Sequence, residues 1–517
     1  MFEKISRRYG RRQVLTAATL GVAGGLVWRP KAASGSERAA DATTGGPQWI
    51  AFGPSPTTSM YVNWSSGSAN GASDPPSQPQ VKWGSSAGRY GTTQDADHSR
   101  QVPMPAGVTG EPVENTFYSN ALIRSLSPGT TYHYSVTNDG SNWSADRTFT
   151  TAGAGLPNFR FTAFGDQATK PRTSAQMVSL IASRKPAFHV SPGDLAYATP
   201  KGEKIPDFDS FHPALWDNYF NIISKTGTHS IPWMASVGAH EVEPLERHGY
   251  AGFVTRFAQP YDAASGTPVA HTFRFGNVAF IHLDGNDLSA QETINTGYSG
   301  GAQTAWLKKK LAGFRAAGSP IDFIVVVCDC CCYSTNRSHG SDGGLRDVWG
   351  PLFDKYHVDL VISGHVHAYE RSNPMRAGKA TRRVARGGSV HPVTDGTTYI
   401  NAGGGGNNLY KTWYGPTDAG DAGNSTPAKI WRWRDGDSAK GGHGGPVQRT
   451  DPVKHFSAYR HAAWSALLVD VTAPTKSNKT TRMRIRAIRP TQSASAVTSI
   501  ASPAVIDSVT LVRTHHG

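Results

Sequence analysis

The sequence predicts a multidomain chain in which an all-β sandwich precedes a layered α/β domain. Up to residue 153, short segments of alternating apolar and polar residues are separated by Gly, Pro and Ser clusters, as in the strands of a sandwich. From residue 158, short apolar runs alternate with segments of helical periodicity, as in βαβ units. Five of the apolar runs also end on Asp, Glu or His, which places polar side chains where strands stop.

The first 45 residues indicate an export signal. The pairs Arg7-Arg8 and Arg11-Arg12 precede TAATLGVAGGLVW, which is too short and too rich in glycine for an ordinary membrane-spanning helix. No other window of the sequence is apolar enough to span a membrane. We therefore expect residues 1–45 to be a twin-arginine-type signal peptide and linker, and the protein to be secreted without a stable membrane anchor.

Part of the net positive charge of the chain comes from this leader. The net charge is +14, and residues 1–40 contain eight Lys/Arg and two acidic residues, which leaves 44 basic and 36 acidic residues. The chain has no Lys- or Arg-rich run, so nucleic-acid binding is not indicated. A mild positive field would favour anionic substrates.

Domain boundaries follow from composition. Residues 46–153 are expected to form the sandwich, with Leu126–Tyr134 (LSPGTTYHY) resembling a corner of fibronectin type III domains. Residues 158–410 are expected to form the α/β domain. Residues 411–517 are expected to supply a loop insertion and C-terminal strands that complete it.

Polar residues end the predicted strands of the α/β domain. The runs are Phe159–Asp166, Ala187–Asp194, Pro232–Glu241, Pro320–Asp329 and Val358–Arg371, and the helical patterns between them are Ser174–Arg184, Thr304–Ala317 and Leu345–Tyr356. Residues i and i+2 of an extended segment point the same way, so we expect His365 and His367 to enter one space beyond a strand end. Because imidazole is the commonest metal ligand, the sequence predicts a metal site there.

Together these motifs resemble the purple acid phosphatases, within the calcineurin-like metallophosphoesterases. The family pattern is GDxG, GDxxY, GNH(D/E), VxxH and GHxH after a fibronectin-like domain, and the resemblance covers roughly residues 46–410. It implies an αββα-type catalytic domain with a binuclear centre of Fe³⁺ and a divalent ion (Zn²⁺, Mn²⁺ or Fe²⁺). Two metals lower the pKa of bound water and clamp phosphoryl oxygens, so the implied reaction is hydrolysis of a small phosphate ester by a metal-bound hydroxide.

The resemblance also implies roles for individual residues. It assigns the first metal to Asp166, Asp194, Tyr197 and His367, with Asp194 bridging both metals and Tyr197 as the tyrosinate that gives the family its colour. It assigns His365 to the second metal, and His240 and His339 to the substrate side, where His339 would steer the phosphate or protonate the leaving group.

Two departures affect the second metal. Ala239 stands where the family has an asparagine ligand, and Asp329 where it has a histidine. Asp329 could itself be a ligand, or the second metal could be lost and leave a mononuclear or slower enzyme. The opposing hypothesis is a catalytically inactive extracellular binding protein. We favour a secreted phosphoric ester hydrolase of the acid phosphatase type, because His240, His339 and four metal ligands remain.

All four cysteines lie in one short segment, as Cys328, Cys330, Cys331 and Cys332. Disulfides between such close neighbours would be strained. One hypothesis is that Cys328 or Cys330 places a thiolate near the second metal and favours zinc, and the alternative is small apolar packing. Trp413, Trp431 and Trp433 could likewise line a substrate cleft or pack a long loop.

Overall fold

The computed structural model describes residues 45–66, 75–103, 115–198, 212–225, 227–245, 248–415, 427–435, 445–493 and 495–515. The predicted signal peptide therefore lies outside the described residues, apart from Gly45. Among the helices of these ranges, none is long and apolar enough to cross a membrane.

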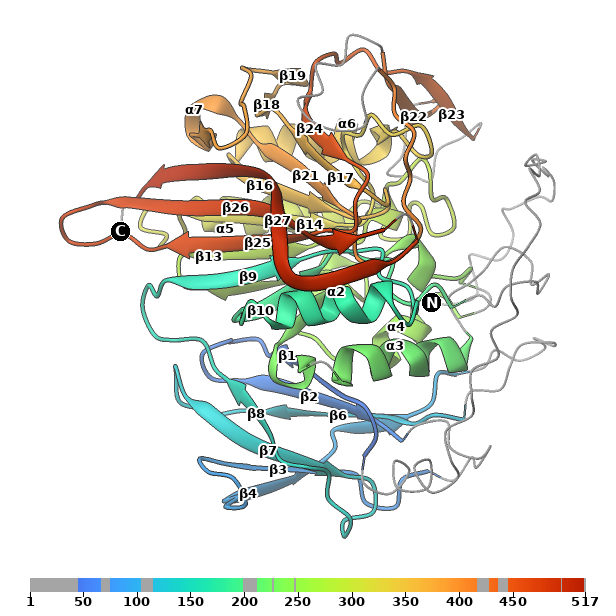
Figure 1. Ribbon diagram of the computed structural model, residues 1–517, viewed down its shortest axis with the longest axis vertical. Helices are drawn as coiled ribbons and strands as arrows, with labels where there is room; N and C mark the ends of the chain where they lie inside the picture. Colours follow the sequence, from blue (N-terminus) through green and yellow to red (C-terminus); the bar gives the residue numbers. More distant parts are fainter. Residues whose placement is uncertain are drawn as a thin grey trace.

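The first domain is a sandwich of two four-stranded antiparallel sheets, at the bottom of Figure 1. Apolar side chains that alternate along the strands, such as Trp64 and Val136, are buried between the sheets. The prediction of an all-β sandwich is confirmed, while its likeness to fibronectin type III stays a prediction. In spatial order the strands are β1 (Gln48–Phe52), β2 (Met60–Ser65), β6 (Tyr118–Ile123) and β5 (His98–Arg100), then β4 (Thr92–Asp95), β3 (Gln80–Gly84), β7 (Thr131–Thr137) and β8 (Arg147–Thr150).

The second domain is built on two seven-stranded sheets. The first has the order β11 (Trp233–Ala235), β10 (Phe188–Ser191), β9 (Phe159–Ala163), β25 (Ala466–Thr472), β26 (Thr480–Gln492), β27 (Val497–Thr514) and β20 (Ser389–Val390). The second has the order β12 (His271–Phe275), β13 (Val278–His282), β14 (Phe323–Cys328), β16 (Leu360–Ser363), β21 (Thr398–Ala402), β17 (Tyr369–Ser372) and β24 (Ser457–His461). The red strands β25–β27 of Figure 1 thus complete the sheet that β9 begins.

An apolar layer joins the two sheets. Phe161 stacks on Phe188 with ring centroids 5.4 Å apart and meets Phe280 of the other sheet edge-to-face at 5.2 Å. The outer face of the first sheet packs against α2 (Thr173–Ala182) and α3 (Pro213–Lys225). The outer face of the second packs against α5 (Ala302–Phe314) and α6 (Gly343–Lys355). This arrangement confirms the predicted αββα layering.

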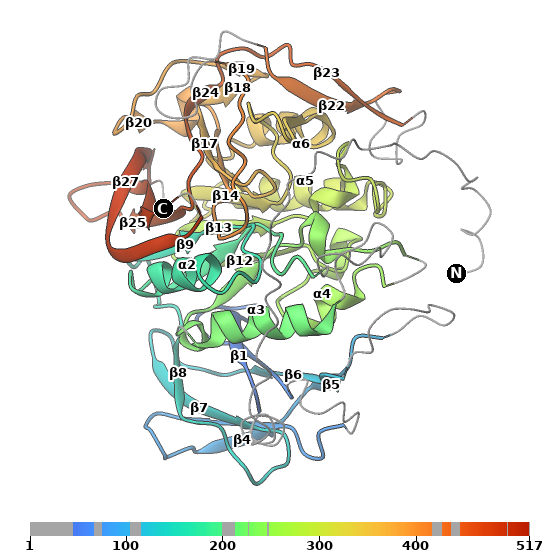
Figure 2. The ribbon, with the colours of Figure 1, turned by 45° about the vertical axis from the view of Figure 1, so that its right-hand side comes forward.

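Aromatic contacts join the sandwich to the α/β domain. Trp49 of β1 stacks on Phe220 of α3 at 3.9 Å between centroids, and Figure 2 shows α3 beside β1. Phe52 lies within 6 Å of the rings of Phe188, Phe273 and Phe275. Such burial of large apolar side chains is what holds two domains in a fixed orientation.

The structure differs from the sequence predictions in two local features. Helix α3 was not predicted, although Trp216, Tyr219, Phe220 and Ile223 form its buried stripe. The extended path predicted for Gly-His-x-His is wrong, because β16 ends at Ser363 and His365 has a φ of 66°. The two histidines converge from a bend after the strand, not from the strand itself.

Candidate metal centre

The carboxyl ends of strands from both sheets meet at one place. Asp166 follows β9, Asp194 follows β10, Asp329 follows β14 and the two histidines follow β16. Asp166, Asp194 and Tyr197 have φ values of 57°, 53° and 50°, so each loop turns sharply after its strand. Non-glycine residues in this region are uncommon, and their concentration here marks a site with a constrained backbone.

The hydroxyl of Tyr197 is the centre of the first group of candidate ligands. Tyr197 Oη lies 2.7 Å from His367 Nε2, 2.9 Å from Asp166 Oδ1 and 3.3 Å from Asp194 Oδ2. His367 Nε2 is also 3.2 Å from Asp166 Oδ1. The structure thus brings together all four residues that the sequence assigned to the first metal.

His367 is held in one tautomer and one orientation. Its Nδ1 lies 2.6 Å from the carbonyl oxygen of Asn408, which can only accept a hydrogen bond. The Nε2 lone pair is therefore left facing Tyr197 and Asp166. Tyr410 stacks on the ring at 4.0 Å with the planes 9° apart. This is the arrangement that orients a metal-ligating histidine.

Glu241 fixes the loop that carries Asp194. Its carboxylate accepts hydrogen bonds from the backbone N–H groups of Asp194 and Gly238 at 2.8 and 2.9 Å, and of Leu195 at 2.7 Å. Burial and the charge on Asp194 raise the pKa of Glu241 to about 8. A Cβ atom on Gly238 would lie 2.3 Å from Asp194 Oδ1, so only glycine allows this approach. Glu241 is thus a positioning residue that sequence reasoning treated only as part of a motif.

Two carboxylates face His365 Nδ1, on the side of the ring that we call the inner side. Its Nδ1 lies 3.7 Å from Asp329 Oδ2 and 3.9 Å from Asp194 Oδ2. Asp329 Oδ2 accepts a hydrogen bond of 3.3 Å from the backbone N–H of Ala239. Ala239 itself offers no side-chain donor atom, as the sequence indicated.

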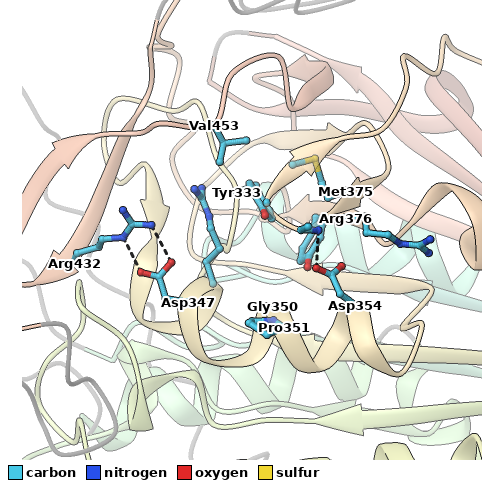
Figure 3. Close-up of a pocket in the computed structure, with 13 residues that line it drawn as sticks. Tyr333, Asp347, Gly350, Pro351, Asp354, Met375, Arg376, Arg432 and Val453 are labelled. Carbon is cyan, nitrogen blue, oxygen red and sulfur yellow. Dashed lines mark hydrogen bonds and ion pairs between the residues drawn. The ribbon is translucent and has the colours of Figure 1, made fainter.

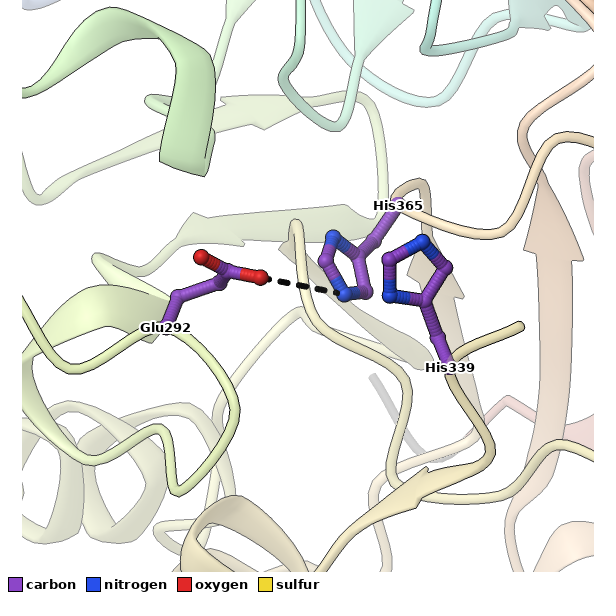
Figure 4. Close-up of side chains that lie close together, drawn as sticks. All are labelled: Glu292, His339 and His365. Atoms are coloured by element: carbon purple, nitrogen blue, oxygen red, sulfur yellow. Dashed lines mark ion pairs between the residues drawn. The ribbon is translucent and has the colours of Figure 1, made fainter. Parts of the chain in front are cut away.

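The outer edge of the His365 ring faces a different set of side chains. Its Nε2 lies 3.2 Å from Gln291 Oε1 and 3.7 Å from Glu292 Oε1. The rings of His339 and His365 lie 4.1 Å apart between centroids. Figure 4 shows Glu292 pointing at His365 with His339 beside it. Neither Gln291 nor Glu292 was predicted as a site residue from the sequence.

Electrostatics favour cations in this cluster. Burial raises the pKa of Asp329, and the charges on Asp194 and Asp166 raise it further. Burial and the same two carboxylates, Asp166 and Asp194, raise the pKa of Tyr197. Asp166 Oδ2 and Asp329 Oδ1 are buried acceptors without a hydrogen-bond partner among the described residues. A bound cation would satisfy such oxygens and reverse the shifts, so the residues present fit a metal centre.

The two histidines assigned to the substrate side pack on different candidate ligands of this cluster. The ring of His240 packs on that of Tyr197 at 4.1 Å between centroids, and its backbone N–H donates to Asp194 Oδ1 at 3.0 Å. His339 packs on His365 and lies 5.2 Å from the ring of Tyr410. Burial and the nearby His365 lower the pKa of His339. Both residues border the cluster, as the sequence predicted.

The cysteine segment is buried and its thiols are free. Cys331 Sγ donates to the Gly364 carbonyl at 3.1 Å, and Cys331 packs with Val366, Ala368 and Trp413. Burial raises the pKa of all four thiols. These contacts favour packing, although Cys330 Sγ lies within 4.8 Å of ligand atoms of Asp329 and His365. Trp413 and Trp433 are also buried, which favours packing for them too.

Residues 403–406, directly after β21, are four successive glycines that were not predicted to belong to the site. A Cβ atom on Gly403 would lie 2.2 Å from the Val366 carbonyl oxygen and 2.6 Å from Asp166 Oδ2. The neighbouring Asn401 donates from its amide to the carbonyl oxygens of Val366 and Ala368, at 2.8 and 3.1 Å. Four successive glycines after an apolar run were the available signal for this close approach.

A separate cavity of about 570 Å³ lies beside α6. Its lining residues include none of the predicted site residues. Figure 3 shows Arg432 paired with Asp347 in this cavity, and the two side chains lie 2.7 Å apart. The cavity therefore does not share the chemistry of the strand-end cluster.

Comparison with known proteins identifies the family of both domains. Residues 159–369 match the family model described as calcineurin-like phosphoesterase, which defines the class of the α/β domain. Residues 49–151 match the model described as purple acid phosphatase, N-terminal domain. The chain belongs to the purple acid phosphatase family, whose members are phosphoester hydrolases that depend on a binuclear metal centre.

Individual relatives span much of the chain. An uncharacterized protein of Mycobacterium tuberculosis is 31% identical over 389 residues, which are 69% of this chain and 68% of that protein. Purple acid phosphatase 22 of Arabidopsis thaliana is 29% identical over 275 residues, 51% of this chain and 57% of that protein. The solved structure of purple acid phosphatase PPD1 from yellow lupin seeds is similar in fold, with a TM-score of 0.63 at 17% identity, over 92% of this chain and 75% of that one.

Proposed function

We propose that this protein hydrolyses phosphate esters at the metal centre formed by the strand-end cluster. The observation that carries the proposal is the convergence of Asp166, Asp194 and His367 on the hydroxyl of Tyr197, within 3.3 Å. These residues would hold the first, ferric ion, because hard carboxylate and phenolate oxygens suit a trivalent metal. The divalent partner, Zn²⁺, Mn²⁺ or Fe²⁺, would bind at His365, which Asp194 and Asp329 face on one side.

When bound, the two metals would lower the pKa of water and neutralise charge on the transferring phosphoryl group. The chain's own residues prepare the site for this chemistry. Glu241 holds the Asp194 loop through three backbone hydrogen bonds, and the Asn408 carbonyl fixes His367. Preorganised groups of this kind need no rearrangement during the reaction.

His240 and His339 would act on the substrate. His240 packs on Tyr197 and His339 packs on His365, so an ester bound at both metals would meet an imidazole next to each. Burial lowers the pKa of His339, and a neutral imidazole can donate one hydrogen bond and accept another. We assign His339 to steering the phosphate or protonating the leaving group, and His240 to positioning next to Tyr197. Water would be the nucleophile and a small phosphate ester the substrate.

A second candidate function is a catalytically impaired extracellular binding protein. The observation that favours it is the pair Ala239 and Asp329, because neither offers the amide oxygen or the imidazole of the family pattern, and Asp329 and Asp194 face His365 Nδ1 only at 3.7 and 3.9 Å. Replacing both, as Ala239→Asn with Asp329→His, separates the two functions. A large rise in turnover would support the impaired protein, and an unchanged rate would support a centre that already works. Export through the twin-arginine-type leader is part of both proposals.

Turnover of p-nitrophenyl phosphate tests the proposed function. Asp194→Asn should abolish it, because Asp194 lies within reach of both Tyr197 and His365. The matched control is Asp347→Asn, because Asp347 pairs with Arg432 at the surface. Wild-type turnover equal to that of Asp194→Asn would overturn the proposal.

A further inference from the structure

Within the described part of the chain, the ring of His365 makes one hydrogen bond, and its partner is Gln291. The distance from His365 Nε2 to Gln291 Oε1 is 3.2 Å. Glu292 Oε1 lies 3.7 Å from the same nitrogen, which is beyond hydrogen-bonding range. On the inner side of the ring, Nδ1 lies 3.7 Å from Asp329 Oδ2 and 3.9 Å from Asp194 Oδ2, also too far for a hydrogen bond. The contact with Gln291 therefore decides which ring nitrogen carries the proton.

A neutral imidazole has one proton and one lone pair, on different nitrogens. The side-chain oxygen of Gln291 can only accept a hydrogen bond, so the contact requires the proton of His365 on Nε2. The lone pair is then on Nδ1, which faces the carboxylates of Asp194 and Asp329. A metal-ligating histidine is usually held in this way, with its other ring nitrogen donating to an acceptor of the protein.

The loop that carries Gln291 is anchored through its backbone. The N–H of Gln291 lies 3.1 Å from both Ser289 Oγ and Asp342 Oδ2, which accept its hydrogen bond. Asp342 is fully buried, and it also accepts from Ser289 Oγ at 2.6 Å and from Gly344 N in the first turn of α6 at 2.8 Å. These bonds tie the loop to the start of a helix, so Gln291 reaches His365 from a fixed base.

One of the clustered cysteines belongs to the same network. Cys330 Sγ donates to Ser289 Oγ at 3.5 Å, and Ser289 Oγ also accepts from the backbone N–H of Glu292 at 2.8 Å. Cys330 lies two residues beyond the end of β14, so this bond connects the loop to a central strand of the second sheet. The position of Gln291 is thus set by both a helix and a strand.

We propose that Gln291 is a positioning residue for the divalent metal: its amide oxygen holds the proton of His365 on Nε2 and keeps the lone pair of Nδ1 directed toward Asp194 and Asp329. This inference rests on the proposed function and adds a residue to its second metal site, to which neither the motifs nor the resemblance assigns Gln291. A ring already held in the binding tautomer takes up a metal without first moving its proton. This matters most in a site where Ala239 gives no donor atom.

Zinc affinity tests the inference, measured on full-length protein with one iron per chain by competition with a chelator of known affinity. Gln291→Met keeps the length of the side chain but removes the acceptor, so it should weaken zinc binding by about tenfold or more while iron stays bound. Gln291→Glu keeps an acceptor oxygen in place of the amide and should restore the wild-type affinity, because a carboxylate supports a ligating histidine equally well.

Glu292→Gln is the matched control, because Glu292 lies beyond hydrogen-bonding range of His365 and the change leaves Gln291 in place. Its zinc affinity should stay close to that of the wild type. A larger loss in Glu292→Gln than in Gln291→Met would overturn the inference, since the neighbouring carboxylate would then be the support.

Unchanged zinc affinity in Gln291→Met would also overturn the inference. So would an equal loss in Gln291→Met and Gln291→Glu, because Gln291 would then act through its shape or its amide N–H. A wild-type protein that binds iron but no zinc would overturn it as well. Zinc binding is measured without substrate, and hydrolysis is compared separately with Asp194→Asn, so the inference and the proposed function fail on different measurements.

Discussion

Tyr197 Oη and His367 Nε2 lie 2.7 Å apart although 170 positions separate them in the sequence. Tyr197 follows a strand of the first sheet and His367 a strand of the second. Their contact therefore depends on the stacking of the two sheets. Any change that shifts one sheet against the other would separate the candidate ligands of the first metal.

Replacing Tyr197 by phenylalanine should remove the visible absorption of the iron-loaded protein. The phenolate oxygen is the group assigned to iron, and phenylalanine lacks it. Tyr410→Phe is the control, because Tyr410 stacks on His367 and should not contribute a ligand. A visible band that persists in Tyr197→Phe and disappears in Tyr410→Phe would contradict the assignment.

Replacing Gly364 by alanine should lower turnover by roughly a hundredfold, the effect of a displacement of about 1 Å in a catalytic site. The added Cβ would lie 2.9 Å from Asp166 Oδ2 and 3.1 Å from Asp329 Oδ1. Gly350→Ala is the matched control, because no atom lies within 4 Å of the added carbon there. Since Gly350 lies inside α6, that control should raise the free energy of unfolding by about 0.5–1 kcal/mol. Equal turnover of the two variants would count against the proposed geometry.

The stability of the protein should fall as pH rises between about 4 and about 7. Burial raises the pKa of Asp284 to about 7, and the charge on Asp287 adds to this effect. The folded state then binds more protons than the unfolded state across that window, so the contribution is full below pH 4 and is lost as pH approaches 7.

Asp284→Asn should reduce this pH dependence by on the order of a few kcal/mol, measured as the free energy of unfolding in urea at pH 4.5 and 7.5. The hydrogen bond from Tyr250 Oη to Asp284 Oδ2, 2.5 Å long, can be kept by the amide oxygen of asparagine. Asp347→Asn, at an exposed ion pair, should leave the slope unchanged. An identical slope in Asp284→Asn would show that other groups cause it.

Phe52→Ala should destabilise the protein by about 3–5 kcal/mol, the usual cost of truncating a buried phenylalanine. Phe52 is fully buried against rings of the α/β domain, so the change removes contacts that join the two domains. Leu245→Ala is the control, because 54% of that residue's surface is exposed. Equal destabilisation of both variants in urea denaturation would contradict the domain contact.

The sequence was most informative where a ligand directly follows a regular element. Asp166 and Asp194 come within three residues of the ends of β9 and β10, so the apolar run locates them. Helix α3 could also have been predicted, because its apolar residues recur every three or four positions.

Other parts of the site depend on contacts that leave no local pattern. Gln291 and Glu292 lie in a loop that Asp342 anchors through a hydrogen bond from Gln291 N, 51 positions earlier in the chain. The bend at His365 depends on a φ of 66° that no side-chain periodicity records.

The most direct measurement of the central claim combines metal content with turnover in one sample of protein exported by its own host. We expect about two metals per chain, one of them iron, and hydrolysis of p-nitrophenyl phosphate well above that of Asp194→Asn. One metal or none, with turnover no greater than that variant's, would contradict a working binuclear phosphatase.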